Sequence, residues 1–320
     1  MRRVTDVTVV LLAILAGASC THRAALLAPI EASEVSAPLP VQVGQVNGVN
    51  IAWSDTGGDG PPIVFIHGLS SYMGFWERQL PVFQAAGYRV LALDLPGFGA
   101  SGRPDAPYTP PWYAALIDGW LTQLGVGRAT VVGHSMGGQI GIFLALDHPE
   151  RVSRLVLTSP AGLETFSPGE GRWMQQYWTE GRALEADEDA IRANFHMNFA
   201  QWDEGVERLM AERVRAAGSE GFRGTSVAVS RCVAGMIEHP VYARLPEVAV
   251  PTLILFGDDD RLIPNPIFHG GSPRAIGEIG AQRIPGARLE MLRGAGHMAQ
   301  HDRPEAWNAL VMDWLKQAAP

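Results

Sequence analysis

Residues 131–138 read Val-Val-Gly-His-Ser-Met-Gly-Gly, and they decide the fold of this 320-residue chain. The β-branched pair ends a predicted buried strand over 130–132, and residues 137–146 have the character of a helix. A strand that turns sharply into a helix holds its turn residue in a strained conformation, where larger side chains two positions away would collide. Gly133 and Gly137 meet that demand. The pattern therefore predicts an elbow that exposes the hydroxyl of Ser135.

Three further stretches surround this elbow in a fixed order along the chain. Residues 61–69 are an apolar run that ends in His-Gly-Leu, and residues 252–260 are another that ends in Gly-Asp-Asp-Asp. Residues 288–292 form a third predicted strand, which is followed by Gly-Ala-Gly-His-Met at 294–298. Serine, acid and histidine thus follow one another in the order that one hydrolase topology requires.

Together the four stretches resemble the α/β-hydrolase fold superfamily, in particular its capped serine esterase and lipase-like members. The resemblance covers about residues 41–318. It implies an α/β fold: a mostly parallel central sheet with helices on both faces and a helical cap inserted over the site. It also implies a serine hydrolase that cleaves a carboxylic ester through an acyl-enzyme intermediate.

A serine hydroxyl is a poor nucleophile near neutral pH, so it needs a base within reach and a buried carboxylate behind that base. We assign these three catalytic roles to Ser135, His297 and Asp260. In the family the acid lies three residues after the glycine that ends the strand and four before a proline, and this spacing selects Asp260. Asp258 and Asp259 are interpreted as turn residues or helix caps.

The negative oxygen of a tetrahedral intermediate needs preorganised donors, and backbone N–H groups supply them. By resemblance to the family, the donors are the N–H of Leu69, directly after His67-Gly68, and the N–H of Met136, directly after the nucleophile. Leu95–Gly102, although rich in glycine, lacks the acidic partner or lysine of a nucleotide site and is interpreted as a structural loop.

The order of apolar runs predicts one elaborated domain. Residues 41–56 are expected to form an antiparallel strand pair around an Asn47-Gly48 turn. A helix over 74–86, a strand over 88–93, a helix over 112–124 and a strand over 154–158 then alternate. Residues 41–161 and 246–320 make up the predicted hydrolase core. Residues 162–245 contain no buried strand and are the predicted helical cap.

The cap segment is rich in aromatic residues and methionine, beyond what a few short helices need for their own packing. Part of it is therefore expected to line an apolar pocket for an ester with an apolar acyl or alcohol part. The pocket residues that we expect are His67, Trp173, Phe195, Trp202, Arg231 and Met298.

The first twenty residues have the shape of a bacterial lipoprotein signal, with Arg2 and Arg3 before an apolar run and Cys20 at the site of lipidation. Residues 21–40 are interpreted as a tether. This predicts an exported protein anchored to a membrane by a lipid on Cys20. An A-x-A site at 16–18, giving a soluble periplasmic or secreted protein, and an uncleaved apolar N-terminus are the alternatives.

Charge and cysteine content limit the other classes. The formal net charge is −8 without a basic patch, so no nucleic acid partner is expected. His301 lies four residues after His297 but lacks the glutamate of a zinc motif, so neither a metal nor another cofactor is expected. Cys232, in an apolar run, is interpreted as a buried hydrophobe. The oligomeric state stays open.

The substrate class also stays open at this level. The resemblance extends to carbon–carbon bond hydrolases of meta-cleavage pathways, which use a cap arginine to hold a substrate carboxylate, a role for which Arg231 is the candidate. Those enzymes usually carry asparagine before the serine and tryptophan after the histidine, where this chain has His134 and Met298. Lactonase, thioesterase, amidase or perhydrolase activity and a ligand-binding protein without turnover are further alternatives. Residues 265–280 form either a loop at the pocket rim or an insertion without function.

Overall fold

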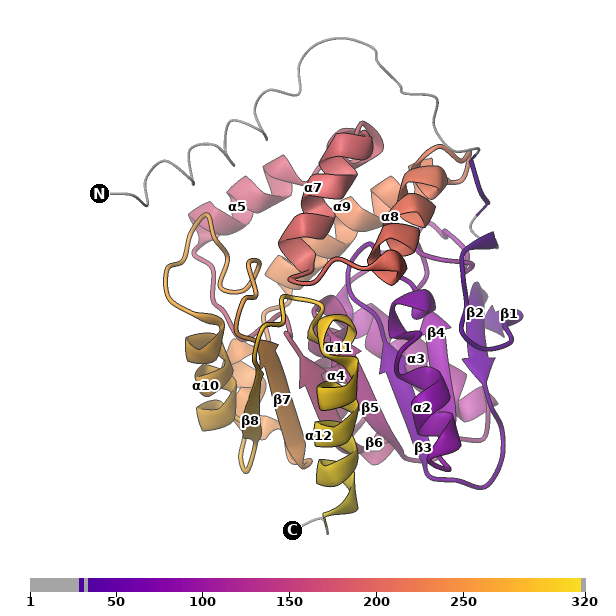
Figure 1. The fold of residues 1–320 in the computed structure, drawn as a ribbon, viewed down its shortest axis with the longest axis vertical. Coiled ribbons are helices and arrows are strands. Elements are labelled where there is room, and N and C mark those ends of the chain that lie inside the picture. Colours follow the sequence, from indigo (N-terminus) through magenta and orange to yellow (C-terminus); the bar gives the residue numbers. More distant parts are fainter. Residues whose placement is uncertain (1–28, 32–33, 318–320) are drawn as a thin grey trace.

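The structure, a computed structural model, describes residues 29–31 and 34–317, and in this part of the chain a sheet of eight strands runs through the protein. The strands are β1 (Gln42–Val46), β2 (Val49–Asp55), β3 (Pro62–Ile66), β4 (Arg89–Asp94), β5 (Ala129–His134), β6 (Val152–Thr158), β7 (Thr252–Gly257) and β8 (Arg288–Leu292). Their order across the sheet is β1-β2-β4-β3-β5-β6-β7-β8. All neighbours from β4 to β8 are parallel, whereas β1 and β2 are antiparallel additions at one edge. The predicted fold class is confirmed (Figure 1).

The antiparallel pair at the edge forms as the sequence predicts. Val46 pairs with Val49, and the two residues between them, Asn47 and Gly48, have φ of 50° and 80°. Both values are positive, as a two-residue hairpin that follows the twist of its strands requires, and asparagine and glycine adopt them readily.

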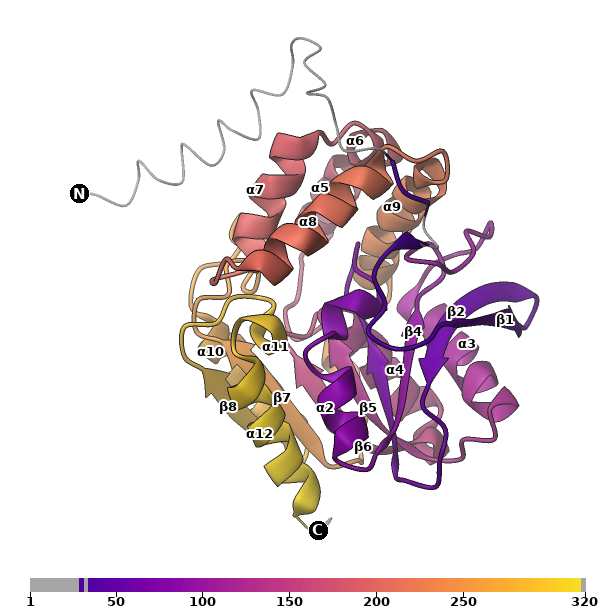
Figure 2. The ribbon, with the colours of Figure 1, turned by 45° about the vertical axis from the view of Figure 1, so that its right-hand side comes forward.

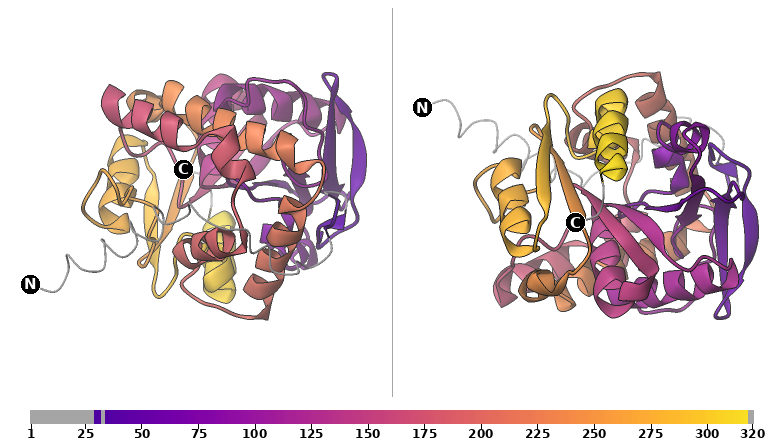
Figure 3. Two further views of the ribbon diagram at one scale, coloured as in Figure 1. Left: turned by 90° about the horizontal axis from the view of Figure 1, so that it is seen from above. Right: turned by 90° about the horizontal axis from the view of Figure 1, so that it is seen from below.

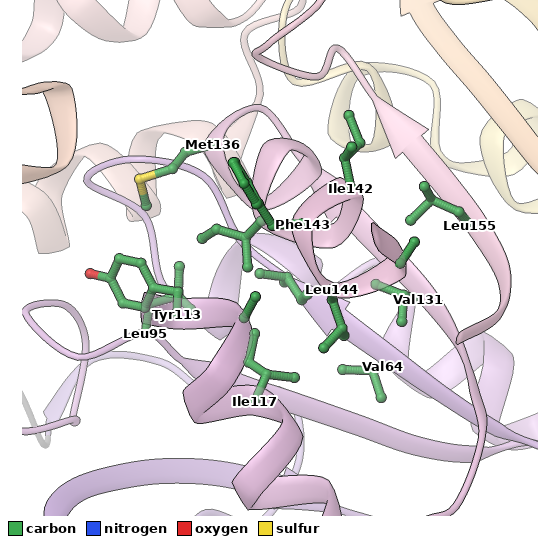
Figure 4. Packing of buried hydrophobic residues seen from close by; sticks show 14 of the residues in the cluster. Val64, Leu95, Tyr113, Ile117, Val131, Met136, Ile142, Phe143, Leu144 and Leu155 are labelled. Atoms are coloured by element: carbon green, nitrogen blue, oxygen red, sulfur yellow. The ribbon is translucent and has the colours of Figure 1, made fainter. Parts of the chain in front are cut away.

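Helices cover both faces of the sheet, so its central strands are buried on both sides. In β3, Val64 and Ile66 belong to one hydrophobic cluster, and Ile63 and Phe65 belong to the cluster on the opposite face. The first cluster is covered by α3 (Pro110–Gln123), α4 (Met136–Asp147) and α10 (Pro273–Arg283), and the second by α2 (Leu80–Ala85) and α12 (Pro304–Lys316). Figure 4 shows Ile117 of α3 and Leu144 of α4 directed toward the strands.

One predicted helix is divided in the structure. The sequence predicts a helix over 74–86, but a short 3-10 helix, η2 (Met73–Trp76), is followed by α2, which begins at Leu80. Pro81 lies in the first turn of α2. A proline cannot donate the hydrogen bond that a continuous helix needs, so the chain restarts its helix there.

Five helices lie between β6 and β7 and form a layer above the carboxyl ends of the strands (Figures 1 and 3). They are α5 (Pro168–Tyr177), α6 (Glu180–Leu184), α7 (Glu188–Asn198), α8 (Glu204–Ala217) and α9 (Phe222–Glu238). A short 3-10 helix, η4 (Tyr242–Glu247), leads back to β7, and η3 (Pro149–Arg151) and α11 (Ala299–Asp302) complete the set of helices in the described residues. These five helices are called the cap below.

The described part of the predicted tether lies against the fold, which the sequence interpretation did not foresee. Ile30 is buried, and the backbone and side chain of Ser36 donate hydrogen bonds to Glu212 of α8. The carbonyl oxygen of Leu39 accepts a hydrogen bond from Ser54 of β2 at 3.3 Å. Figure 2 shows this indigo segment running from the cap to the core. Val35 packs against the cluster that contains Phe195 of α7, and Leu39 packs against the cluster that contains Ile63 of β3. The described residues before β1 therefore link the cap to the core and are called the strap below.

The signal segment, Cys20 and residues 21–28 lie outside the described residues, so the anchor at Cys20 remains a prediction. Among the helices that are described, none has the length and apolar character needed to cross a membrane.

Candidate active site

Ser135 lies at the junction of β5 and α4 with φ of 52° and ψ of −118°, an unusual conformation for a residue other than glycine. The glycines around it are required by close contacts. A Cβ atom on Gly133 would lie 2.3 Å from the carbonyl oxygen of Gly137, and a Cβ on Gly137 would lie 2.3 Å from that of Ile66. The elbow therefore tolerates no side chain at either position.

Asp260 and His297 are in direct contact. Oδ2 of Asp260 lies 2.9 Å from Nδ1 of His297, and both side chains are almost completely buried. The other carboxylate oxygen, Oδ1, accepts hydrogen bonds from the N–H groups of Leu262 and Ile263 at 2.9 and 3.1 Å. Asp260 thus holds the proton of His297 on Nδ1, which leaves Nε2 as the nitrogen able to accept a proton.

The two neighbouring aspartates have other partners. Asp258 accepts a hydrogen bond from the N–H of Gly294 at 2.6 Å. Asp259 is half exposed and pairs with Arg261 at 2.6 Å. Of the three adjacent carboxylates, the histidine meets the one that the spacing selected.

His134 supports His297 from the side of the elbow, a contact that the sequence did not reveal. The two rings lie edge to face with centroids 4.8 Å apart, and Nε2 of His134 is 3.0 Å from the carbonyl oxygen of His297. Because that oxygen can only accept, Nε2 of His134 carries the proton. Burial and the nearby His297 hold the pKa of His134 well below its usual range, so the ring is neutral.

The predicted oxyanion donors lie where β3 and the elbow meet. Leu69 follows β3, and Met136 is the first residue of α4. Within the described residues, neither N–H donates to another backbone or side-chain group outside the helix ladders. The first N–H groups of a helix have no partner within the helix. Both donors are therefore available to a ligand.

His67 has a structural role rather than the pocket role that we expected. Its Nδ1 lies 2.8 Å from the carbonyl oxygen of Gly68, and its Nε2 accepts the N–H of Leu95 at 2.9 Å. Burial lowers its pKa to about 4. Both ring nitrogens are occupied within the protein, so His67 shapes the loop that carries Leu69.

The remaining predicted pocket residues separate into two groups. Phe195 of α7 and Met298, the residue after His297, are buried in one hydrophobic cluster between the cap and the core. Trp173 and Trp202 are more than a third exposed, and they stack on Tyr177 and His196. Met298 and Phe195 are thus near the site, whereas the two tryptophans lie on the outside of the cap.

Arg231 also lies at the surface, where it pairs with the exposed Asp105 at 2.6 Å. The arginine that lines a pocket is Arg213 of α8, which is half-buried and which sequence reasoning missed. It lines this pocket together with Ser70, Ser71, Tyr72, Phe98 and Arg103. Ser70 and Ser71 directly follow Leu69, so this pocket begins at the predicted oxyanion loop.

Arg213 has no carboxylate within ion-pairing distance among residues 29–31 and 34–317, and its guanidinium lies 4.8 Å from the ring of Phe222. Burial lowers its pKa to about 10, so the group stays charged at neutral pH. The only sequence signal was an arginine in an amphipathic helix, which commonly faces solvent.

In the described residues, the group of side chains able to hold a metal ion is Asp118, His148 and Glu150. His148 and Glu150 precede β6, at the amino edge of the sheet, whereas Ser135, Asp260 and His297 all follow strands at its carboxyl edge. Arg151 already donates to Asp118 at 2.5 Å. His301, the other candidate, lies 3.5 Å from Glu77.

The fold and the elbow define a class of hydrolases, and the comparisons agree. Residues 61–304 match the family described as the alpha/beta hydrolase fold, and the chain belongs to this family. The protein is thus a hydrolase of the α/β-hydrolase family.

Similar proteins differ in what they act on. The chain is 31% identical to a candidate non-heme chloroperoxidase from Synechocystis, covering 86% of this chain and 99% of that protein. It is also 31% identical to a 2-hydroxy-6-oxononadienedioate/2-hydroxy-6-oxononatrienedioate hydrolase from Burkholderia vietnamiensis, covering 84% and 92%. The crystal structure of a probable hydrolytic enzyme from Pseudomonas aeruginosa superposes with a TM-score of 0.83 at 28% identity, covering 91% and 99%.

Proposed function

We propose that this hydrolase cleaves carboxylic esters through a covalent acyl-enzyme, with Ser135 as nucleophile, His297 as base and Asp260 as its carboxylate partner. The observation that carries the proposal is the buried 2.9 Å contact between Asp260 and His297. It lies at the same edge of the sheet as the strained elbow that presents Ser135. No cofactor is needed for this chemistry.

In the first half of the reaction, Oγ of Ser135 attacks the ester carbonyl carbon while Nε2 of His297 takes the hydroxyl proton. The carbonyl oxygen becomes an oxyanion, which accepts hydrogen bonds from the N–H groups of Leu69 and Met136. One such donor contributes about 3 kcal/mol of transition-state stabilisation. The intermediate collapses, the bond to the alcohol oxygen breaks, and His297 returns the proton to the leaving alcohol.

In the second half, His297 removes a proton from water, whose oxygen attacks the acyl carbon. The carboxylic acid leaves, and Ser135 regains its proton from His297. Asp260 stays ionised throughout and stabilises the imidazolium that forms twice in each turnover.

The buried cluster of Phe195 and Met298 and the apolar wall of Phe98 favour an ester with an apolar part. We also propose that the protein is exported and tethered to a membrane through a lipid on Cys20. Apolar esters partition into such a membrane. Ordinary export to the periplasm or medium is the alternative, and mass spectrometry of the mature N-terminus distinguishes the two.

A fluorophosphonate probe and a series of p-nitrophenyl esters of increasing acyl length test the main proposal. The probe is expected to label the protein once. Ser135→Ala is expected to remove labelling and ester hydrolysis together, whereas Ser272→Ala, at the exposed start of α10, retains both. Labelling that persists in Ser135→Ala contradicts the assignment of the nucleophile.

A second candidate function is carbon–carbon bond hydrolysis of the kind named for the Burkholderia relative, whose substrate is a dioate. The specific observation in its favour is Arg213, a half-buried cation that lines the pocket beginning at Ser70 and has no carboxylate within ion-pairing distance in the part of the chain that the structure describes. It is the cap arginine suited to a substrate carboxylate, in place of Arg231.

A coloured 2-hydroxy-6-oxo-dienoate, followed by the loss of its visible absorbance, tests this second candidate. If it is the substrate, Arg213→Met raises its KM about tenfold or more, and Arg231→Met leaves it unchanged. Assays with lactones, thioesters and amides as substrates, and with hydrogen peroxide as the acyl acceptor, test the remaining alternative activities. A protein that binds one equivalent of ligand without repeated product release is a receptor.

A further inference from the structure

The end of α7 contacts both loops that carry the proposed acid and base. The N–H of Met298, next to His297, donates to the carbonyl oxygen of Asn198 at 3.0 Å. Arg261, next to Asp260, donates to the carbonyl oxygen of His196 at 2.8 Å. One short piece of the cap therefore touches residues adjacent to both members of the pair.

Asp302 of α11 strengthens this junction with three hydrogen bonds. Its Oδ2 accepts the N–H of Ala200 at 2.9 Å and the N–H of Gly296 at 2.7 Å, and its Oδ1 accepts the N–H of Gln201 at 3.1 Å. Two of these donors, Ala200 and Gln201, lie in the connection between cap helices α7 and α8, and the third, Gly296, directly precedes His297. Asp302 is 7% exposed, so water cannot readily replace these hydrogen bonds if they are lost.

The backbones at this junction leave no space between them. A Cβ atom on Gly296 would lie 2.9 Å from the nitrogen of Ala200 and 2.9 Å from the carbonyl oxygen of Asn198. A shift of the cap segment 198–201 therefore displaces the loop of His297 directly, because interfaces packed at this distance do not deform independently.

We propose that Asp302 is a positioning residue that holds the cap segment 198–201 and the His297 loop in one arrangement. The position of the cap over bound substrate and the orientation of the His297 imidazole are then coupled, so that a change in one changes the other. Asp302 touches no reacting atom and acts only through Gly296 and the cap. The inference rests on the proposed role of His297.

Asp302→Ala and Asp302→Asn test it, with Asp313→Asn as the matched control, since Asp313 is exposed on α12 and pairs with Lys316. We expect kcat on p-nitrophenyl acetate to fall roughly 10- to 100-fold in Asp302→Ala, because a small misplacement of a catalytic group has effects of that size. Asp302→Asn is intermediate because its amide keeps one acceptor oxygen, and KM changes little.

The position of the His297 side chain can also be measured in the absence of catalysis. Its Nδ1 proton, held by Asp260, is expected to give a low-field proton NMR resonance that shifts or broadens in Asp302→Ala and stays unchanged in Asp313→Asn. A residue that only stabilised the fold would lower the melting temperature without changing this resonance.

Gly296→Ala perturbs the same junction with Asp302 intact and serves if Asp302→Ala does not fold. Its control is Gly270→Ala, where an added Cβ meets nothing within 4 Å. The double variant Gly296→Ala/Asp302→Asn is expected to be no slower than Gly296→Ala alone, because both changes break one contact.

Folded Asp302→Ala and Gly296→Ala proteins with kcat within twofold of the wild type and an unchanged resonance would overturn the inference, even if the proposed function stands. A wild-type protein that neither hydrolyses esters nor reacts with the fluorophosphonate would overturn the proposed function instead, and the resonance would still report whether Asp302 positions His297.

Discussion

Asp260→Asn is the change whose consequence follows most directly from the geometry. Oδ1 of Asp260 accepts the N–H groups of Leu262 and Ile263, so the single oxygen of the new amide must occupy this position. Its NH2 group then faces Nδ1 of His297 and donates to it. The histidine is forced to carry its proton on Nε2, where it cannot accept the proton of Ser135.

The expected loss in kcat is about 10⁴-fold, the scale seen when the same wrong tautomer is imposed on another serine triad. This corresponds to about 5 kcal/mol in the activation free energy. Asp259→Asn is expected to change kcat less than twofold because Asp259 is half exposed and faces Arg261. Asp258→Asn keeps an oxygen for the N–H of Gly294 and is expected to be mild.

The assay is stopped-flow hydrolysis of p-nitrophenyl acetate, with each variant's folded fraction measured by circular dichroism. A folded Asp260→Asn protein within tenfold of the wild-type kcat would refute the tautomer argument. Equal loss in Asp258→Asn would show that a different aspartate serves the histidine.

Three further predictions concern stability. Gly137→Ala is expected to prevent folding, because the added Cβ would lie 2.3 Å from a backbone oxygen of β3, whereas Gly270→Ala leaves soluble yield and melting temperature unchanged; equal yields would refute the contact. A variant lacking residues 1–28 is expected to keep its kcat and melting temperature. A variant lacking residues 1–39 is expected to melt several degrees lower, because it loses the burial of Ile30 and the hydrogen bonds of Ser36 to Glu212, and the burial and the hydrogen bonds each contribute roughly 1.5–3 kcal/mol to the free energy of unfolding. Identical melting temperatures of the two variants would show that the strap contributes nothing to stability. The depressed pKa of His67, about 4, means that its contribution to the free energy of unfolding is complete above pH 6.5 and is lost as the pH falls toward 4, because the unfolded chain binds the proton first. Urea unfolding measured as a function of pH is expected to show a contribution of about 3 kcal/mol from this residue. If the free energy of unfolding of a His67→Asn variant depends on pH as strongly as that of the wild type, this prediction is wrong.

Local patterns were sufficient wherever a short stretch must adopt one backbone shape. Glycines two positions either side of Ser135 have no alternative in an elbow of this tightness, and Asn47-Gly48 between two alternating runs can scarcely be anything but a hairpin turn. The spacing from Gly257 to Pro264 selected Asp260 because it matches the spacing of the acid in the family that the chain resembles. The strands of the sheet and the acid that meets His297 were therefore predictable, whereas α10, which begins within a segment interpreted as a loop or an insertion, was not.

Contacts between side chains from distant segments became visible only in the folded protein. Arg213 and Arg231 are both arginines on cap helices, and nothing local distinguishes the one in the pocket from the one at the surface. His134 supports His297 across 163 positions of sequence, and Ser36 reaches Glu212 across 176. Asp302 joins three N–H groups from two separate segments. Periodicity and turn chemistry specify backbone shape over a few residues, whereas these contacts depend on how whole helices pack, and packing is settled by the shapes of all the surfaces that meet.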